Sequence, residues 1–210
     1  MMKKHDLPKI IPVFPLSNFI IFPNTTVPLN IFELRYIEMI KDSMKTNKLI
    51  GLIQPKQNKP NIIPDLYEIG CLGKITNFTE TPDGKYQINL EGISRFKFKK
   101  IIKTDYKFIT IDADTLIYKK NQKNLNKNLN ENLLSYFKKF LDVKNIKFNL
   151  SEFEQLDSIN LAKIICVISP LDNLMKQMLL EFNSEDELCS NLLSVLEVEI
   201  SNKENNLKIN

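Results

Sequence analysis

Short apolar runs, separated by prolines and turn residues, occupy the first half of the chain. Runs of this length that are rich in β-branched and aromatic residues predict strands. They cover residues 9–14, 19–22, 25–31, 49–54, 68–80, 85–98 and 106–117. Within residues 85–98, Tyr86, Ile88 and Leu90 alternate with polar residues, so one face of this strand is expected to be buried and the other hydrated.

The residues between and within these runs indicate how the strands bend and connect. Residues 81–84 read Thr-Pro-Asp-Gly, in which proline presets the turn and glycine accepts a positive φ, so residues 68–98 are predicted to form a long β-hairpin. Gly70, Gly73 and Gly92 lie inside strand patterns and predict bulges of the kind that a small, strongly curved barrel requires. Pro28 cannot donate to a ladder, which places its strand at an edge or at a bulge.

The period changes to that of a helix at residues 32–46 and again throughout the second half. A polar stretch rich in Lys and Asn at residues 119–132 precedes apolar positions at helical spacing. We expect helices over residues 129–141, 151–168, 171–182 and 184–200. Ser151 with Glu154 and Ser184 with Glu187 have the spacing of capping boxes. The sequence therefore predicts an α+β chain: a β-rich part at residues 1–118, a helical bundle at 119–205 and a frayed tail at 206–210.

Composition and charge narrow the class of protein. Hydrophobic residues make up 43% and charged residues 26%, as in ordinary globular domains, and the apolar runs are too short to cross a membrane as helices. The net charge is +4, but the lysines are scattered, and the densest cluster is Lys97, Lys99 and Lys100. A nucleic-acid partner is therefore not favoured, because such a partner calls for a clustered basic face.

Residues that could carry chemistry are sparse. The three cysteines lie far apart and have no neighbouring histidine, so we expect no metal site and no disulfide framework. Cysteines without a disulfide framework are typical of a reducing compartment, and prolines interrupt the amino-terminal apolar stretch that could otherwise be a signal peptide. The sequence therefore predicts a cytoplasmic protein. The single histidine, His5, lies near the amino terminus, and Asp112 and Asp114, which share a strand face, are expected to be solvated charges. We expect no catalytic residues, no metal and no cofactor.

Several segments, in order and at matching spacing, resemble the amino-terminal, substrate-binding domain of Lon proteases. They are residues 12–16 (PVFPL), 22–23 (FP), 27–36 (VPLNIFELRY), 69–73 (IGCLG), 82–84 (PDG), 91–96 (EGISRF), 176–177 (KQ) and 179–181 (LLE). The resemblance covers about residues 10 to 200. It implies a PUA-like β-barrel followed by a helix bundle, in agreement with the patterns above.

The resemblance also implies a function. Lon proteases continue into an ATPase module and a peptidase domain, and this chain ends where those would begin, so the resemblance implies a stand-alone member with neither activity. In the family, this region engages protein substrates and helps to assemble the oligomer. We therefore expect non-enzymatic binding of unfolded or client polypeptide, as an adaptor or regulator in protein quality control. An RNA-binding module of PUA-like type and a structural assembly partner are the alternatives.

Only two of the 29 basic residues are arginines, Arg35 and Arg95, and both fall inside the resembling segments. A guanidinium group holds a carboxylate by two points, which an ammonium group cannot do. Helical spacing places Glu33 on the same face as Ile37 and Ile40, where its carboxylate would need a partner. The sequence therefore suggests a structural tie between Glu33 and Arg95, with exposure of both residues as the alternative.

Large apolar residues are unusually dense beside the proline-flanked strands, where Phe14 also lies. The candidate polypeptide-binding residues are Phe22, Pro23, Leu29, Ile31, Phe32, Arg35 and Tyr36. Most of them are expected to form barrel core. The alternative is that some line a shallow groove that accepts extended, apolar polypeptide, for example by strand addition at an edge, with Arg35 at the rim.

Overall fold

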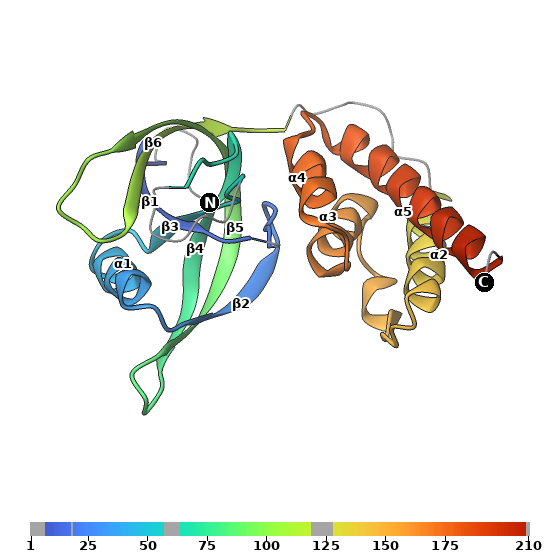
Figure 1. The fold of residues 1–210 in the computed structure, drawn as a ribbon, viewed down its shortest axis with the longest axis horizontal. Coiled ribbons are helices and arrows are strands. Elements are labelled where there is room, and N and C mark those ends of the chain that lie inside the picture. The colour runs from blue at the N-terminus through green and yellow to red at the C-terminus, as the bar shows by residue number, and fades with distance from the viewer. Residues whose placement is uncertain (1–6, 18, 57–63, 119–127, 209–210) are drawn as a thin grey trace. The chain divides into compact units, whose positions relative to one another are not determined.

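The computed structural model describes residues 7–17, 19–56, 64–118 and 128–208, and divides into two compact units, residues 1–117 and residues 118–210 (Figure 1). The described residues of the first unit form six strands and one helix. Its elements are β1 (Ile10–Pro15), β2 (Thr26–Ile31), α1 (Leu34–Lys45), β3 (Leu49–Ile53), β4 (Ile69–Glu80), β5 (Tyr86–Ile102) and β6 (Ile109–Leu116).

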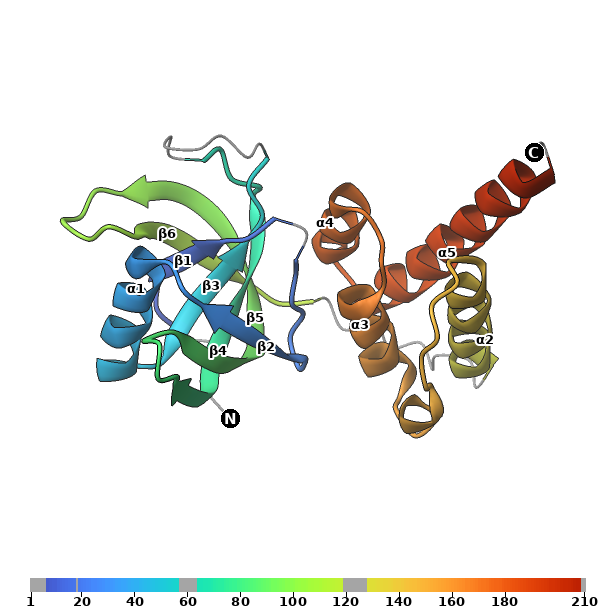
Figure 2. The same cartoon turned by 60° about the horizontal axis from the view of Figure 1, so that its bottom comes forward.

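The strands form a closed ring with one strand outside it. The sheet order is β2-β5-β4-β3-β1-β6, and β6 pairs in addition with β5. Since β5 is 17 residues long, its first part pairs with β2 and its second part closes the ring against β6. The strand β2 therefore extends the sheet beyond the closed ring (Figure 2).

Bulges and one close backbone contact account for the strong curvature. The registers of β4 with β5 and of β5 with β6 shift at three places among the described residues. One shift lies at Gly73, opposite Gly92, as the interior glycines had predicted, whereas Gly70 pairs with Phe96 in regular register. At Gly92 of β5, an added Cβ atom would lie 2.0 Å from the carbonyl oxygen of Phe22. Only glycine allows the chain before β2 to pass this close to the barrel.

That close passage explains why the predicted strand at residues 19–22 is wrong. The segment is apolar and Ile20, Ile21 and Phe22 are buried, but it has no strand partner. The Thr25 hydroxyl accepts a hydrogen bond from the Phe22 amide (3.0 Å) and donates one to the Phe22 carbonyl (2.8 Å). These local bonds, followed by Asn24 at φ 68°, turn the chain into β2 instead of extending a ladder.

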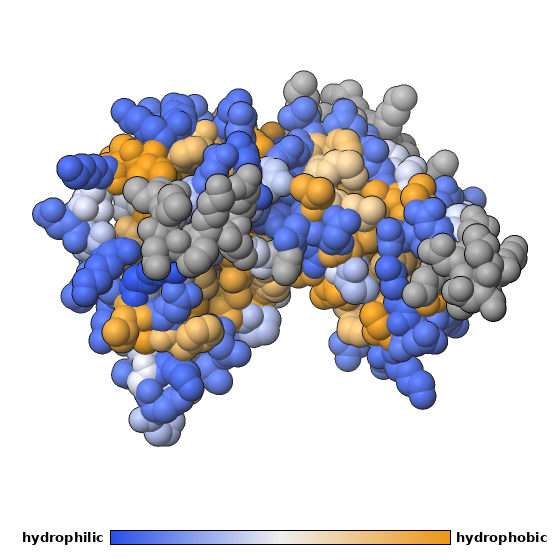
Figure 3. Space-filling model, in the orientation of Figure 1, coloured by the Kyte–Doolittle hydropathy of each residue, from blue (hydrophilic) through white to orange (hydrophobic). Residues whose placement is uncertain are grey.

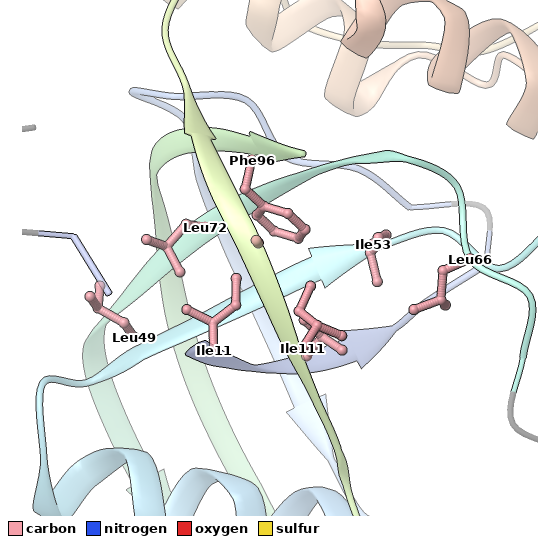
Figure 4. Close-up of a cluster of buried hydrophobic side chains, with 9 residues drawn as sticks. Ile11, Leu49, Ile53, Leu66, Leu72, Phe96 and Ile111 are labelled. Carbon is pink, nitrogen blue, oxygen red and sulfur yellow. The ribbon is translucent and has the colours of Figure 1, made fainter. Parts of the chain in front are cut away.

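The core of the first unit lies inside the ring (Figure 4). It consists of Ile11, Val13, Leu49, Ile53, Leu66, Leu72, Phe96, Ile111 and Ala113. The helix α1 covers a different part of the unit and buries Tyr36, Met39 and Ile40, which lie at helical spacing.

In the second unit, the residues that the structure describes form a bundle of four α-helices and one short 3-10 turn. They are α2 (Asn128–Val143), η2 (Ser151–Phe153), α3 (Ser158–Ile168), α4 (Asn173–Glu181) and α5 (Glu185–Lys208), and α5 contacts each of the other three α-helices. Its core is made of Leu133, Phe137, Phe140, Leu161, Ile165, Cys166, Leu179, Leu188, Leu192 and Leu196.

The two predicted capping boxes have different outcomes. Ser184 caps α5: its hydroxyl accepts from the Glu187 amide (3.2 Å), while the Glu187 carboxylate accepts from the Asn183 amide (3.1 Å). The predicted cap at Ser151 is wrong, because the turn there ends after three residues. The helix α3 begins instead after Asp157, whose carboxylate accepts two amide hydrogen bonds.

The predicted end of the last helix is also wrong. The helix α5 continues to Lys208, eight residues beyond the predicted end at Ile200. A polar sequence without glycine or proline gives no signal that stops a helix, and the predicted end rested on the loss of apolar periodicity alone.

Candidate functional site

A hollow of about 360 Å³ lies where the end of β1, the second half of β2 and the start of α1 meet. Five of the seven predicted binding residues line it: Leu29, Ile31, Phe32, Arg35 and Tyr36. Phe14 to Ser17, at the end of β1, complete the wall together with Asn30 and Glu33. On the face drawn in Figure 3, apolar residues gather below α1, where β2 leads into that helix.

Strand alternation decides which of these side chains are accessible. In β2, Val27, Leu29 and Ile31 are buried, whereas the residues between them are exposed. Phe32 follows on the exposed side of this alternation, and the chain turns into α1 directly after it. Its ring is therefore left 65% exposed, although a phenyl ring of this size normally finds a core position.

The inner wall of the hollow is a stack of three side chains. The rings of Phe14 and Tyr36 lie 4.2 Å apart between centroids, and the Arg35 guanidinium lies 4.7 Å from the centroid of the Tyr36 ring. Burial raises the pKa of the Tyr36 hydroxyl, so this group stays neutral at physiological pH. The stack presents apolar faces inward and one cation at its outer end.

The remaining predicted site residues lie elsewhere. Phe22 is fully buried beside Gly92, and Pro23 is half-buried in the turn that precedes β2. Neither lines the hollow. These two residues form part of the packing that holds the chain against β5.

The predicted tie between Glu33 and Arg95 is replaced by a local ion pair. The Glu33 carboxylate accepts from Arg35, with 2.7 Å to Nη2 and 3.0 Å to Nε, and both side chains are about half exposed. Arg95 is 2% exposed within β5, opposite Cys71 of β4 and Leu116 of β6. Glu33 is the N-cap residue with extended backbone (φ −75°, ψ 130°), so helical spacing does not place its side chain.

A second hollow, of about 540 Å³, lies on the other side of Phe32 and was missed by the sequence analysis. Its lining is polar except for two rings: Asn30, Phe32, Thr81, Asp83, Lys85, Tyr86 and Gln87. Hydrogen bonds from Lys85 and Thr81 lower the pKa of Asp83 to about 2. The signal that could have found it is the pairing of β2 with β5, which sets Asn30 opposite Gln87.

A third hollow, of about 710 Å³, lies in the helical unit between α2 and residues 146–154. Phe148 is 49% exposed there and stacks on Phe153 at 5.7 Å between ring centroids. Lys138 and Lys147 face this hollow together with Asp142 and Glu154, so its lining carries both charges equally. This balance gives no preference for one charge class of ligand.

The other candidate groups have charged neighbours or are buried. Asp114 pairs with Lys99 at 2.6 Å, and Asp112 lies opposite Lys100 in the ladder. Burial raises the pKa of both the Cys166 and Cys189 thiols, the latter to about 12. Within the described residues, no cluster of three His, Cys, Asp or Glu side chains could hold a metal ion. His5 lies outside the described residues.

Comparison with known proteins identifies the family to which this chain belongs. Residues 10–198 match the family model described as the substrate-binding domain of the ATP-dependent protease La (Lon). The chain belongs to this Lon substrate-binding domain family. The family supports a substrate-binding role in general for this region, in agreement with the resemblance seen in the sequence.

Full-length relatives extend well beyond the matched region. The Lon proteases of two Buchnera aphidicola strains, from Acyrthosiphon pisum and from Baizongia pistaciae, are 29% and 30% identical to this Lon-family chain over 90% of its length. The chain spans about a quarter of the length of these relatives.

Solved structures confirm the α+β, PUA-like architecture. A Lon N-terminal domain protein from Xanthomonas campestris matches with a TM-score of 0.65 and 17% identity, covering 88% of this chain and 97% of that one. The N-terminal domain of a Mycobacterium avium complex Lon protease matches with a TM-score of 0.62 and 17% identity, covering 92% and 98%. Among the described residues, none of the helices combines the length and apolar character needed to span a membrane.

Proposed function

We propose that this Lon-family chain binds client polypeptide without catalysing a reaction, and that the hollow beside Phe32 is the contact site. The observation that carries the proposal is the Phe32 ring, which is 65% exposed at the edge of a hollow lined by Leu29, Ile31 and Tyr36. An exposed apolar surface beside a shaped hollow is typical of an interaction site. A chain with this property would serve as an adaptor or regulator in protein quality control.

The chemistry of the hollow favours apolar segments of unfolded protein over phosphate-bearing ligands. Arg35 is its one basic residue, and the Glu33 carboxylate already accepts from it. Nucleic acids gain most of their binding energy from phosphates that several cations neutralise. Binding in this hollow would instead come from burial of apolar area, which depends little on salt.

The test is a titration of the chain with a labelled, chemically unfolded protein at low and moderate salt. Phe32→Ser is expected to weaken binding by about 5- to 30-fold, because it removes a contact worth roughly 1–2 kcal/mol. Leu174→Ser, in the other unit, is the matched control, since Leu174 is 67% exposed and lies outside all the hollows described above.

The outcomes separate the alternatives. Loss of binding with Phe32→Ser but not with Leu174→Ser supports the hollow as the site. Equal loss with both variants means that exposed apolar residues bind without a defined site. A labelled RNA that binds with a steep decrease as salt rises, while the unfolded protein does not bind, would assign the chain to nucleic acid instead.

A further inference from the structure

The strand β2 has one free edge. It pairs with β5 along Thr26–Ile31 and is the terminal strand of the sheet order among the described strands, whereas β1, β3, β4, β5 and β6 each have partners on both sides. A free edge presents unpaired N–H and C=O groups and is a template for another extended chain. Among the described strands, β2 is the one that lacks a second partner along its whole length; shorter stretches with one partner are residues 77–80 of β4 and residues 114–116 of β6, which pair with β5 alone.

Two observations show which backbone groups face outward. The Gly92 amide donates to the Thr25 carbonyl at 2.8 Å, so the backbone carbonyl of Thr25 faces β5. In an antiparallel ladder these directions alternate, so Val27, Leu29 and Ile31 pair with β5. Pro28 has no N–H group, and its outward position costs the ladder no bond.

The outward groups are therefore the N–H and C=O groups of Thr26 and Asn30 and the C=O group of Pro28. The side chains of these three residues are exposed as well. A proline at the centre of the edge leaves only two donors, which limits the length of chain that this edge can pair with. Native proteins use such a device to keep an edge from pairing with its own copies.

The two faces of β2 give this edge a side-chain preference. On one face of β2, the buried residues Leu29 and Ile31 line the first hollow, and on the other face Thr26, Pro28 and Asn30 are exposed to solvent. In a paired strand, successive side chains point to opposite faces of the sheet. A strand added to β2 would direct alternate side chains toward the apolar first hollow and toward the solvated, polar face of the sheet.

We propose that the client segment binds as an added strand on β2, and that the edge selects segments in which large apolar residues alternate with polar ones. This inference rests on the proposed function and specifies how the client is held. The carbonyls of Thr26, Pro28 and Asn30 accept from the client amides, and the amides of Thr26 and Asn30 donate to client carbonyls. A segment of about five residues satisfies the whole edge.

N-methylated peptides test this geometry on the full chain. The parent is a fluorescently labelled nine-residue peptide that alternates Ile or Phe with Thr or Lys. One analogue carries N-methyl groups on the amides that face β2 when the apolar residues occupy the first hollow. The matched control carries the same number on the intervening amides. A slip by one residue cannot rescue the first analogue, because it would turn every apolar side chain to the polar side.

We expect the first analogue to bind at least about tenfold more weakly than the parent, because each lost amide donor weakens the edge pairing. We expect the control analogue to bind within about twofold of the parent. Amide hydrogen exchange supplies a second reading: the parent peptide is expected to slow exchange at Thr26 and Asn30. Equal weakening by the two analogues, or no weakening by either, would overturn strand addition. If all three peptides bind and lose affinity with Phe32→Ser, the proposed function stands while strand addition fails. If none binds, both fail.

Discussion

Lys163 of α3 and Glu185 of α5 form an ion pair with 2.6 Å between Nζ and Oε1, although the Lys163 side chain is only 2% exposed. The same ammonium group lies 5.3 Å from the centroid of the Tyr118 ring. Glu185 is at the first turn of α5, where a carboxylate also interacts favourably with the helix amino terminus. The pair thus joins two helices of the bundle at a point where a buried charge needs compensation.

Glu185→Gln is expected to destabilise the fold, because it leaves the buried Lys163 ammonium without its counter-charge. We expect a loss of about 1–3 kcal/mol in the free energy of unfolding, less than for a wholly buried pair because Glu185 is partly exposed. Chemical denaturation measures it. The exposed pair between Lys97 and Glu68 is the control: Glu68→Gln is expected to cost under about 1 kcal/mol. Equal effects of the two substitutions would contradict a special role for the buried pair.

Gly92→Ala tests the close passage between β5 and the segment before β2. The added Cβ atom would lie 2.0 Å from the Phe22 carbonyl oxygen, a backbone atom that cannot move aside without shifting the chain. We expect a loss of about 2–4 kcal/mol in the free energy of unfolding. Gly84→Ala is the control, since nothing lies within 4 Å and only its φ of +76° is unfavourable. Gly84→Ala is expected to lower the free energy of unfolding by about 1 kcal/mol. The denaturation midpoints of the two variants, ranked against the unaltered chain, are the measurement.

Local patterns were sufficient where the structure depends on neighbours in sequence. The turn at residues 81–84 forms as predicted, with Gly84 at positive φ, and alternation identified Tyr86, Ile88 and Leu90 as the buried positions of β5. The density of large apolar residues beside the proline-flanked strands pointed to Phe32. These features depend on turn chemistry and period alone.

The features that sequence patterns missed have both local and tertiary causes. Ser151 had the spacing of a cap, but Asp157, six residues later, starts α3. Glu33 was placed by helical spacing although it precedes the helix. The second hollow arises only when β2 pairs with β5 and brings Asn30 to Gln87, which are far apart in the sequence. No local pattern reports such a pairing.

The buried thiols give the stability a dependence on alkaline pH. Burial raises the pKa of Cys189 to about 12, above the ordinary thiol value of 9.0, and raises that of Cys166 as well. Above pH 9 the unfolded chain loses thiol protons that the folded chain retains, so stability is expected to fall as pH rises from about 9 towards 12. The slope is at most about 1.4 kcal/mol per pH unit for each thiol.

Lys176 acts in the opposite direction, because burial lowers its pKa and the unfolded chain binds its proton more tightly. The contribution of Lys176 to the free energy of unfolding therefore rises with pH below 10.5. Cys189→Ala is expected to flatten the fall above pH 9, whereas Lys176→Met is expected to steepen it. Unfolding midpoints between pH 7 and 10.5 measure both slopes. An unchanged pH profile in Cys189→Ala would contradict the assignment.

Pro28 is expected to limit pairing at the free edge of β2, since it removes the central N–H group from the outward-facing set. Pro28→Thr adds that donor, while the side chain at this position stays exposed. The variant is expected to bind the alternating peptide more tightly, by about 3- to 10-fold for one added hydrogen bond. It is also expected to self-associate at high concentration, because an unprotected edge pairs with its own copies.

Thr26→Val changes an exposed side chain of the same strand without altering the backbone donors, and it serves as the control. Sedimentation velocity and peptide titration give the two readings. If Pro28→Thr stays monomeric and binds the peptide as the unaltered chain does, the edge is not accessible to a partner strand, and the client contacts the hollow through its side chains alone.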